Sequence, residues 1–278
     1  MNTGYNKERP THTIIKADLE ELNLILLTND STLIERKVKE IQKLIEHSLQ
    51  LFPDSSFILD SDAAFSEILK RSPAAIESLK KAFKLNKRST YLALRLSRIY
   101  EEQNEIDDAV KTLTECLERN PGDKSINYRL SYYLEVYNLG SIKEIKYHLR
   151  RSFTIGDDNY VSQFWFARSL YIDGDHAEAL EIFQTLKNLN IDNRIKKKIR
   201  GYVLEDKQKK RFSGTISKLE SSYAFIMRDG ENDRMFSHVT SNDKKAWDML
   251  SVGKRVVFNL AFNYRGPQAM NVQLESEN

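Results

Sequence analysis

The spacing of apolar residues changes once along the chain. Over about residues 16–208 they recur at the three- and four-residue steps of an α-helix, and glycine and proline are few. Between Ser222 and Val239, in contrast, rings recur at every second position within two short runs, which is typical of strands. The pattern therefore predicts a long helical region followed by a small β domain.

The helical region contains an internal repeat. Residues 91–123 predict a helix pair in which small residues allow the two helices to cross closely and Pro121 ends the second helix. Similar runs begin near residues 124 and 160, so successive copies start roughly 34 residues apart. One or two degenerate copies precede them, with second helices marked by Ala75, Leu79 and Ala82 and by Ile41, Ile45 and Ser48.

This repeat resembles the tetratricopeptide repeat, whose helix pairs cannot bury their apolar faces alone and stack into an α-solenoid with a concave groove. The resemblance implies that the first helix of each pair lines the groove. The matching positions are Tyr91, Arg98, Tyr128, Tyr132, Phe164, Arg168 and Tyr171. Such a groove is expected to hold a protein segment or another ligand, because tyrosine and arginine are frequent at binding hot spots. The alternative is that several of these side chains pack against the neighbouring helix.

The alternating segment predicts a hairpin. Asp229-Gly230 is a turn signal between two runs in which every second residue is an aromatic ring or a histidine. Pairing of the two strands brings four rings to one sheet surface, namely Tyr223, Phe225, Phe236 and His238. Exposed rings on a sheet suit the stacking of unpaired nucleobases. The alternative interpretation is that the rings fill the core of a small barrel.

Residues 211–275 resemble a cold-shock domain. Four motifs follow one another in the order of that family: aromatic-x-aromatic-Ile, Phe-x-His, Gly-x-x-Val-x-Phe and Gly-Pro-x-Ala-x-x-Val. The resemblance implies a five-stranded antiparallel oligonucleotide-binding (OB) barrel whose base-stacking residues fall on the four rings named above. The match departs from the family where Lys218 or Leu219 stands in place of a tryptophan and where Ala224 replaces a glycine. These changes predict weaker or narrower binding, with Lys218 counted among the contacts.

The positive charge of the chain is concentrated just before this domain. Residues 194–211 contain nine Lys and Arg against Glu205 and Asp206, whereas the whole chain carries a net charge of +3. We predict a basic helical connector whose Lys196, Lys197 and Lys198 contact phosphates, because phosphate neutralisation supplies the salt-sensitive part of nucleic-acid affinity. The alternative is an ordinary solvated helix face.

The sequence contains no arrangement that predicts catalysis, a metal or a cofactor. A glycine-rich phosphate loop is absent, and the five histidines are scattered without a second ligand at metal-binding spacing. Asp173-Gly174-Asp175-His176 falls where the repeat requires a turn. The single cysteine, Cys116, suits a reducing cytoplasm, and no apolar run approaches a membrane span or a signal peptide.

These observations predict a multi-domain α + β protein. Its expected parts are a disordered or extended N-terminus (1–15), tetratricopeptide-like helical repeats (16–193), the basic helical connector (194–210) and the cold-shock-like barrel (211–275). The predicted function is non-enzymatic binding of single-stranded RNA or DNA by the barrel, with a protein partner on the repeats and no membrane association. One alternative is the sensor half of a bacterial defence protein whose catalytic domain lies elsewhere. Another is a pure interaction scaffold.

Overall fold

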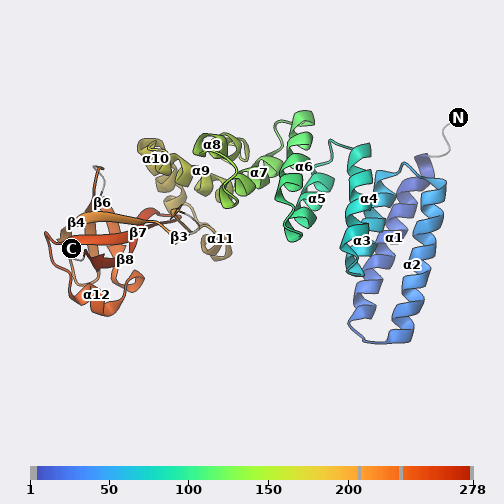
Figure 1. Ribbon diagram of the computed structural model, residues 1–278, viewed down its shortest axis with the longest axis horizontal. Coiled ribbons are helices and arrows are strands. Elements are labelled where there is room, and N and C mark those ends of the chain that lie inside the picture. The colour runs from blue at the N-terminus through green and yellow to red at the C-terminus, as the bar shows by residue number, and fades with distance from the viewer. Residues whose placement is uncertain (1–4, 206–207, 232–233, 276–278) are drawn as a thin grey trace. The chain divides into compact units, whose positions relative to one another are not determined.

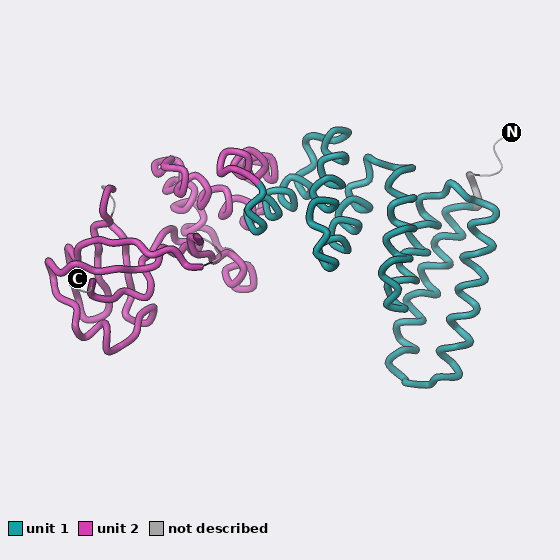
Figure 2. The backbone as a smooth tube through the Cα atoms, in the orientation of Figure 1, with its two compact units in different colours: residues 1–139 teal, residues 140–278 magenta. Residues whose placement is uncertain are grey.

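The computed structural model describes residues 5–205, 208–231 and 234–275 (Figure 1). The chain forms two compact units, residues 1–139 and residues 140–278, which are drawn in different colours in Figure 2.

The first unit is helical. Its elements are α1 (Tyr5–Leu26), α2 (Ser31–Leu51), α3 (Ser56–Ile68), α4 (Ser72–Leu85), α5 (Thr90–Glu102), α6 (Ile106–Arg119) and α7 (Lys124–Val136). The prediction of a disordered or extended N-terminus is wrong from residue 5 onward, while residues 1–4 lie outside the described residues. The physical reason is an apolar stripe on α1, in which Ile15, Leu19 and Leu22 pack with Ile41 and Ile45 of α2.

The predicted repeat pattern is present as consecutive helix pairs. Ala75, Leu79 and Ala82 are fully buried on α4, and Ala109 and Cys116 are fully buried on α6. Small residues at these positions let neighbouring helices approach closely, and larger side chains then fill the space between them. The degenerate copy before residue 90 is therefore a complete helix pair, α3 and α4.

The second unit joins helices to a barrel. Its helices are α8 (Ile142–Arg151), α9 (Tyr160–Ile172), α10 (His176–Asn188), α11 (Asn193–Lys198) and α12 (Lys244–Asp248). Its strands are β1 (Gly201–Tyr202), β2 (Leu204–Glu205), β3 (Gln208–Lys209), β4 (Arg211–Leu219), β5 (Tyr223–Arg228), β6 (Arg234–His238), β7 (Arg255–Asn263) and β8 (Gly266–Leu274). A 3-10 turn, Val239–Ser241, follows β6.

The predicted helical connector is helical only at its start, in α11. Beyond it, β1 pairs with β7, and β2 pairs with β3 as a short hairpin whose central residues 206–207 are not described. The lysines and arginines favour a helix locally, but Gly201 and the strand-forming Tyr202 and Val203 interrupt it. The backbone N–H of Val203 donates to the carbonyl of Leu260 in β7, 3.0 Å away. This bond gives the extended segment a backbone hydrogen-bond partner on the edge of β7.

The barrel consists of the five strands from β4 to β8. Neighbouring strands pair antiparallel except β6 and β8, whose parallel pairing closes the barrel. Its interior is filled by alternate side chains, among them Ile216, Ile226, Val256, Phe258 and Val272, each at most 1% exposed. The predicted fold class, a helical repeat region followed by a five-stranded OB barrel, is confirmed.

The last helix pair and the barrel share a core. Phe262 of β7 stacks on Phe183 of α10 with 6.0 Å between ring centres, and its edge meets Tyr171 of α9 at 5.5 Å. Gly266 has a left-handed backbone (φ 112°), and a Cβ atom there would lie 3.5 Å from the Phe183 ring. One mouth of the barrel is therefore covered by α9 and α10.

Candidate nucleic-acid interface

The strand register places the four predicted rings on the outer face of the barrel. Tyr223 pairs with His238, and Phe225 pairs with Phe236. The residues between them point inward and are at most 2% exposed: Ala224, Ile226, Met235 and Ser237. Phe236 is 37% exposed, and the other three rings are partly exposed. The rings therefore do not fill the barrel core, which was the alternative interpretation.

The rings touch one another and form a single surface, which we call the ring patch (Tyr223, Phe225, Phe236 and His238). Tyr223 and Phe236 lie nearly parallel, 6.1 Å apart and inclined by 25°. Phe225 meets both of them edge-on, at 5.7 and 5.9 Å. His238 lies 6.4 Å from Phe236 at an intermediate angle. Flat and edge-on rings together offer apolar surface that is suited to planar ligands.

A cation lies at the border of the ring patch. Lys218 pairs with Phe225 across β4 and β5, and its Nζ donates to the Tyr223 hydroxyl at 3.2 Å. The same Nζ lies 3.2 Å from the Glu220 carboxylate. The hydrogen bond to Tyr223, with that to Glu220, raises the pKa of Lys218, so the ammonium stays charged at neutral pH. The family resemblance leads one to expect a tryptophan at Lys218 or Leu219, and neither residue supplies a stacking ring.

The histidine end of the ring patch is held by the turn that follows β6. The backbone N–H of Thr240 donates to His238 Nδ1 at 3.2 Å, so the neutral ring carries its proton on Nε2. Asn242 donates to the His238 carbonyl at 2.7 Å and accepts from the Val272 N–H at 2.7 Å. The side chain of Asn242 thus joins the backbone at the end of β6 to β8, while the contacts with Thr240 hold the histidine ring.

Gln268, which was not predicted from the sequence, extends the patch onto β8. It is the pairing partner of Phe236, and its neighbour Ala269 is fully buried. Side chains of adjacent strand residues point to opposite faces, so Gln268 shares the outer face with the rings. The signal in the sequence was the alternation around Ala269 in the last motif.

The three lysines predicted to contact phosphates all lie on α11. Lys196 lies with its Nζ 5.0 Å from the ring centre of Tyr264, in the turn between β7 and β8. Lys197 and Lys198 are exposed on α11. A phosphate contact from these three lysines stays a prediction.

The residues predicted to line a groove divide between the two units. In the first unit, Tyr91 is 58% and Tyr132 37% exposed, Arg98 is exposed, and Tyr128 is half-buried. In the second unit the expectation of an open groove is wrong, because Phe164, Arg168 and Tyr171 are at most 5% exposed. Arg168 donates to the Tyr202 carbonyl at 2.7 Å, and Tyr171 packs on the barrel, so the connector and the barrel cover this helix face.

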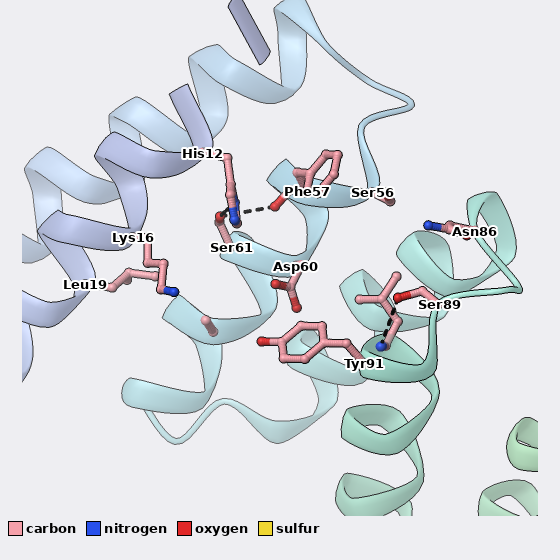
Figure 3. A pocket seen from close by; sticks show the side chains of 12 residues that line it. His12, Lys16, Leu19, Ser56, Phe57, Asp60, Ser61, Asn86, Ser89 and Tyr91 are labelled. Carbon is pink, nitrogen blue, oxygen red and sulfur yellow. Dashed lines mark hydrogen bonds between the residues drawn. The ribbon is translucent and has the colours of Figure 1, made fainter. Parts of the chain in front are cut away.

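A recess of about 300 Å³ lies in the first unit. Figure 3 shows Lys16, Asp60 and Tyr91 reaching toward a common space from α1, α3 and α5. His12 is held beside them by a 2.8 Å contact between its Nδ1 and the Ser61 hydroxyl. The Asp60 carboxylate is paired with the Arg95 guanidinium. Tyr91 therefore lines a concave site together with the Lys16 side chain and the Asp60 carboxylate, whose charge is balanced by Arg95.

The turn between α9 and α10 is structural. Both carboxylates, Asp173 and Asp175, form ion pairs with Lys146, and Gly174 takes a left-handed backbone (φ 93°). Within residues 5–205, 208–231 and 234–275, no group of three or more metal-binding side chains occurs. Over the same ranges no helix is both long enough and apolar enough to cross a membrane.

The closed five-stranded barrel of β4 to β8 defines the class of OB-fold domains. Residues 212–275 match the family model described as the 'Cold-shock' DNA-binding domain. The chain is also similar to a cold shock-like protein of Aquifex aeolicus (strain VF5), with 31% identity over 68 residues that cover 24% of this chain and 97% of that protein. Through its C-terminal barrel, the chain belongs to the cold-shock domain family.

The helical region matches a second family. Residues 70–129, from α4 into α7, match the tetratricopeptide repeat model. Among solved structures, the chain is similar to Pseudomonas aeruginosa PilF, at 13% identity and a TM-score of 0.47, over 68% of this chain and 81% of that one. It is also similar to YrrB, described as a TPR protein with an unusual peptide-binding site, at 13% identity and a TM-score of 0.44, over 64% of this chain and 87% of that one.

Proposed function

We propose that the protein binds single-stranded RNA or DNA by stacking unpaired bases on the ring patch. The observation that carries this proposal is the β5–β6 register, which turns four adjacent rings outward while the alternate residues fill the core. Every nucleobase has a flat face, and each base stacked on an aromatic ring contributes about 1–3 kcal/mol. Bases within a duplex are already stacked on one another, so single strands are the expected ligand.

The chemistry of the patch favours broad recognition over strict sequence reading. Stacking tolerates any base, while Lys218 at the border supplies a charge that can meet a phosphate. Hydrogen-bond readout is expected only from the few polar groups at the edge, such as Nε2 of His238 and the amide of Gln268. The two families that match are binding modules, which supports a function without catalysis.

The repeats are proposed to hold a protein partner. The supporting observation is the recess between α1, α3 and α5, where Tyr91 is 58% exposed beside Lys16 and Asp60. A side chain of the partner protein could contact the ring of Tyr91 and, at the same time, one of the charged groups of Lys16 and Asp60. That the chain is the sensor part of a bacterial defence protein, with the catalytic domain elsewhere, stays a prediction. In that case the ring patch or the recess would recognise the trigger.

Fluorescence anisotropy with labelled oligonucleotides tests the proposal directly. The full chain should bind single strands more tightly than duplexes of the same sequence, and its affinity should fall with added salt. Comparable affinity for duplexes and single strands would contradict stacking as the source of binding. Absence of binding to any single strand would end the proposal.

A further inference from the structure

One level of the strand register continues around the outside of the barrel beyond the ring patch. The pairing partners at this level are, in order, Lys218, Phe225, Phe236, Gln268, Ala261 and Tyr202. Paired residues on neighbouring strands point to the same face of a sheet. Tyr202, which the connector contributes through β1, therefore lies on the same outer face as Phe225 and Phe236.

The connector is fastened to this face. The side-chain amide of Asn259 in β7 donates to the carbonyls of Lys209 and Lys210, at 3.3 and 3.1 Å. Asn271 of β8 in turn donates to Asn259 Oδ1 at 3.0 Å. These bonds hold the short hairpin of β2 and β3 against β7, next to Tyr202.

Lys209 is positioned by the ring of Tyr202. Its Nζ lies 4.0 Å from the ring centre, and the Tyr202 hydroxyl donates to the sulfur of Met270 in β8 at 3.4 Å. The neighbouring Lys210 is instead paired with the carboxylate of Glu205 at 2.8 Å. An ammonium that rests on an uncharged ring keeps its full positive charge, and Lys209 is exposed.

We infer that the single-stranded nucleic acid bound at the ring patch continues across β8 and β7 to the hairpin of β2 and β3. There, Lys209 neutralises one of its phosphates. This inference rests on the proposed function. Phe236 and Tyr202 are separated by three strand spacings, about 14 Å along the sheet. Gln268 lies on this path and can donate to or accept from a base or a phosphate. Tyr202 acts as a positioning residue, because it fixes the lysine that makes the contact.

The inference makes the effect of Lys209 depend on ligand length. Anisotropy is measured for the full chain with oligonucleotides of roughly 4 to 16 nucleotides, the range of sites found on OB folds. For long strands, Lys209→Ala should flatten the plot of log affinity against log salt by about 0.7, the value of one phosphate contact on a single strand. For the shortest strand that binds, the plot should stay unchanged. Lys143→Ala, an exposed lysine of α8, is the matched charge control and should leave both plots unchanged.

A second variant pair tests the positioning role. Tyr202→Phe keeps the ring under Lys209 and should retain the salt slope for long strands, whereas Tyr202→Ala should lower it as Lys209→Ala does. If long strands bind to Lys209→Ala with the wild-type slope while the wild-type chain binds single strands, the strand does not reach the connector and the inference is wrong. If Lys143→Ala flattens the slope equally, the effect is one of overall charge, which also overturns the inference. Absence of wild-type binding would instead refute the proposed function itself.

Discussion

Removal of two rings from the ring patch should separate binding from folding. In the double variant Tyr223→Ala with Phe236→Ala, each ring lost removes about 1–3 kcal/mol of stacking, so affinity for a single strand should fall by at least roughly 30-fold. Phe225 meets both rings edge-on at 5.7 and 5.9 Å and remains in place, so the loss is expected near the lower end of the range. Neither truncation opens a cavity in the core, because both side chains are on the outer face.

The fold of the double variant can be checked in the same samples. Both tryptophans of the chain lie in the second unit: Trp165 is on α9 and Trp247 is on α12, beside the barrel. Urea unfolding followed by tryptophan fluorescence therefore reports the unit that carries the patch. The expected loss in unfolding free energy is confined to exposed ring pairs, about 0.5–1.5 kcal/mol for each pair.

The matched control is Tyr147→Ala, which removes a ring that is 52% exposed on α8 in the same unit. It should bind single strands like the unmodified chain. Wild-type affinity in the folded double variant would refute the assignment of the stacking surface. An equal loss in Tyr147→Ala would show that the effect does not depend on the position of the ring.

Three further predictions concern the core, the thiol and the connector. Phe183→Ala should lower the free energy of unfolding in urea by about 3–5 kcal/mol and should shift the signals of both tryptophans together. Leu180→Ala, at an exposed position of the same helix, should lower it far less. Two separate transitions would contradict a shared core. Burial raises the pKa of the Cys116 thiol to about 11 from an ordinary value of 9.0, so its contribution to stability is fully present below pH 9 and is lost as the pH rises through 11. Urea unfolding followed by helix ellipticity should therefore show a steeper alkaline loss for the unmodified chain than for Cys116→Ala, and identical pH profiles would contradict this. Replacement of the three α11 lysines by alanine should flatten the salt dependence of single-strand binding, and an unchanged slope would exclude α11 from the contact.

The ring face could be predicted from the sequence because it depends on local rules. A period of two fixes which side chains share a face, and Asp229-Gly230 marks the connection between the two strands on which Phe225 and Phe236 pair. The repeat pattern was readable for a similar reason, since small residues such as Ala109 recur wherever two helices cross closely. In both cases the spacing along the chain is itself the structural constraint.

The errors arose where distant segments decide the outcome. The connector carries many helix-forming lysines, yet β4 leaves part of the edge of β7 unpaired, and the segment from Gly201 to Val203 fills it. Likewise, Arg168 and Tyr171 occupy groove positions of a repeat, but the connector and the barrel cover them. No local pattern contains this information, because the covering surface begins some thirty residues later in the chain.

The contact between the last helix pair and the barrel affects both the ring patch and the connector that carries Lys209. Helices α9 and α10 close the mouth of the barrel at Phe262 and Gly266, whereas the rings lie on the outer side of β5 and β6. A helix pair that supports the barrel core without covering the rings leaves the stacking surface accessible to a strand. Arg168 also donates to the Tyr202 carbonyl in β1, and the Tyr202 ring positions Lys209. The last repeat therefore fixes both the barrel and the part of the connector that places Lys209. A change in the packing of α9 should therefore disturb the contact at Lys209 more than the ring patch. Substitution of Arg168 should lower the affinity for long oligonucleotides more than the affinity for short ones. Equal losses for both lengths would show instead that α9 supports the barrel as a whole.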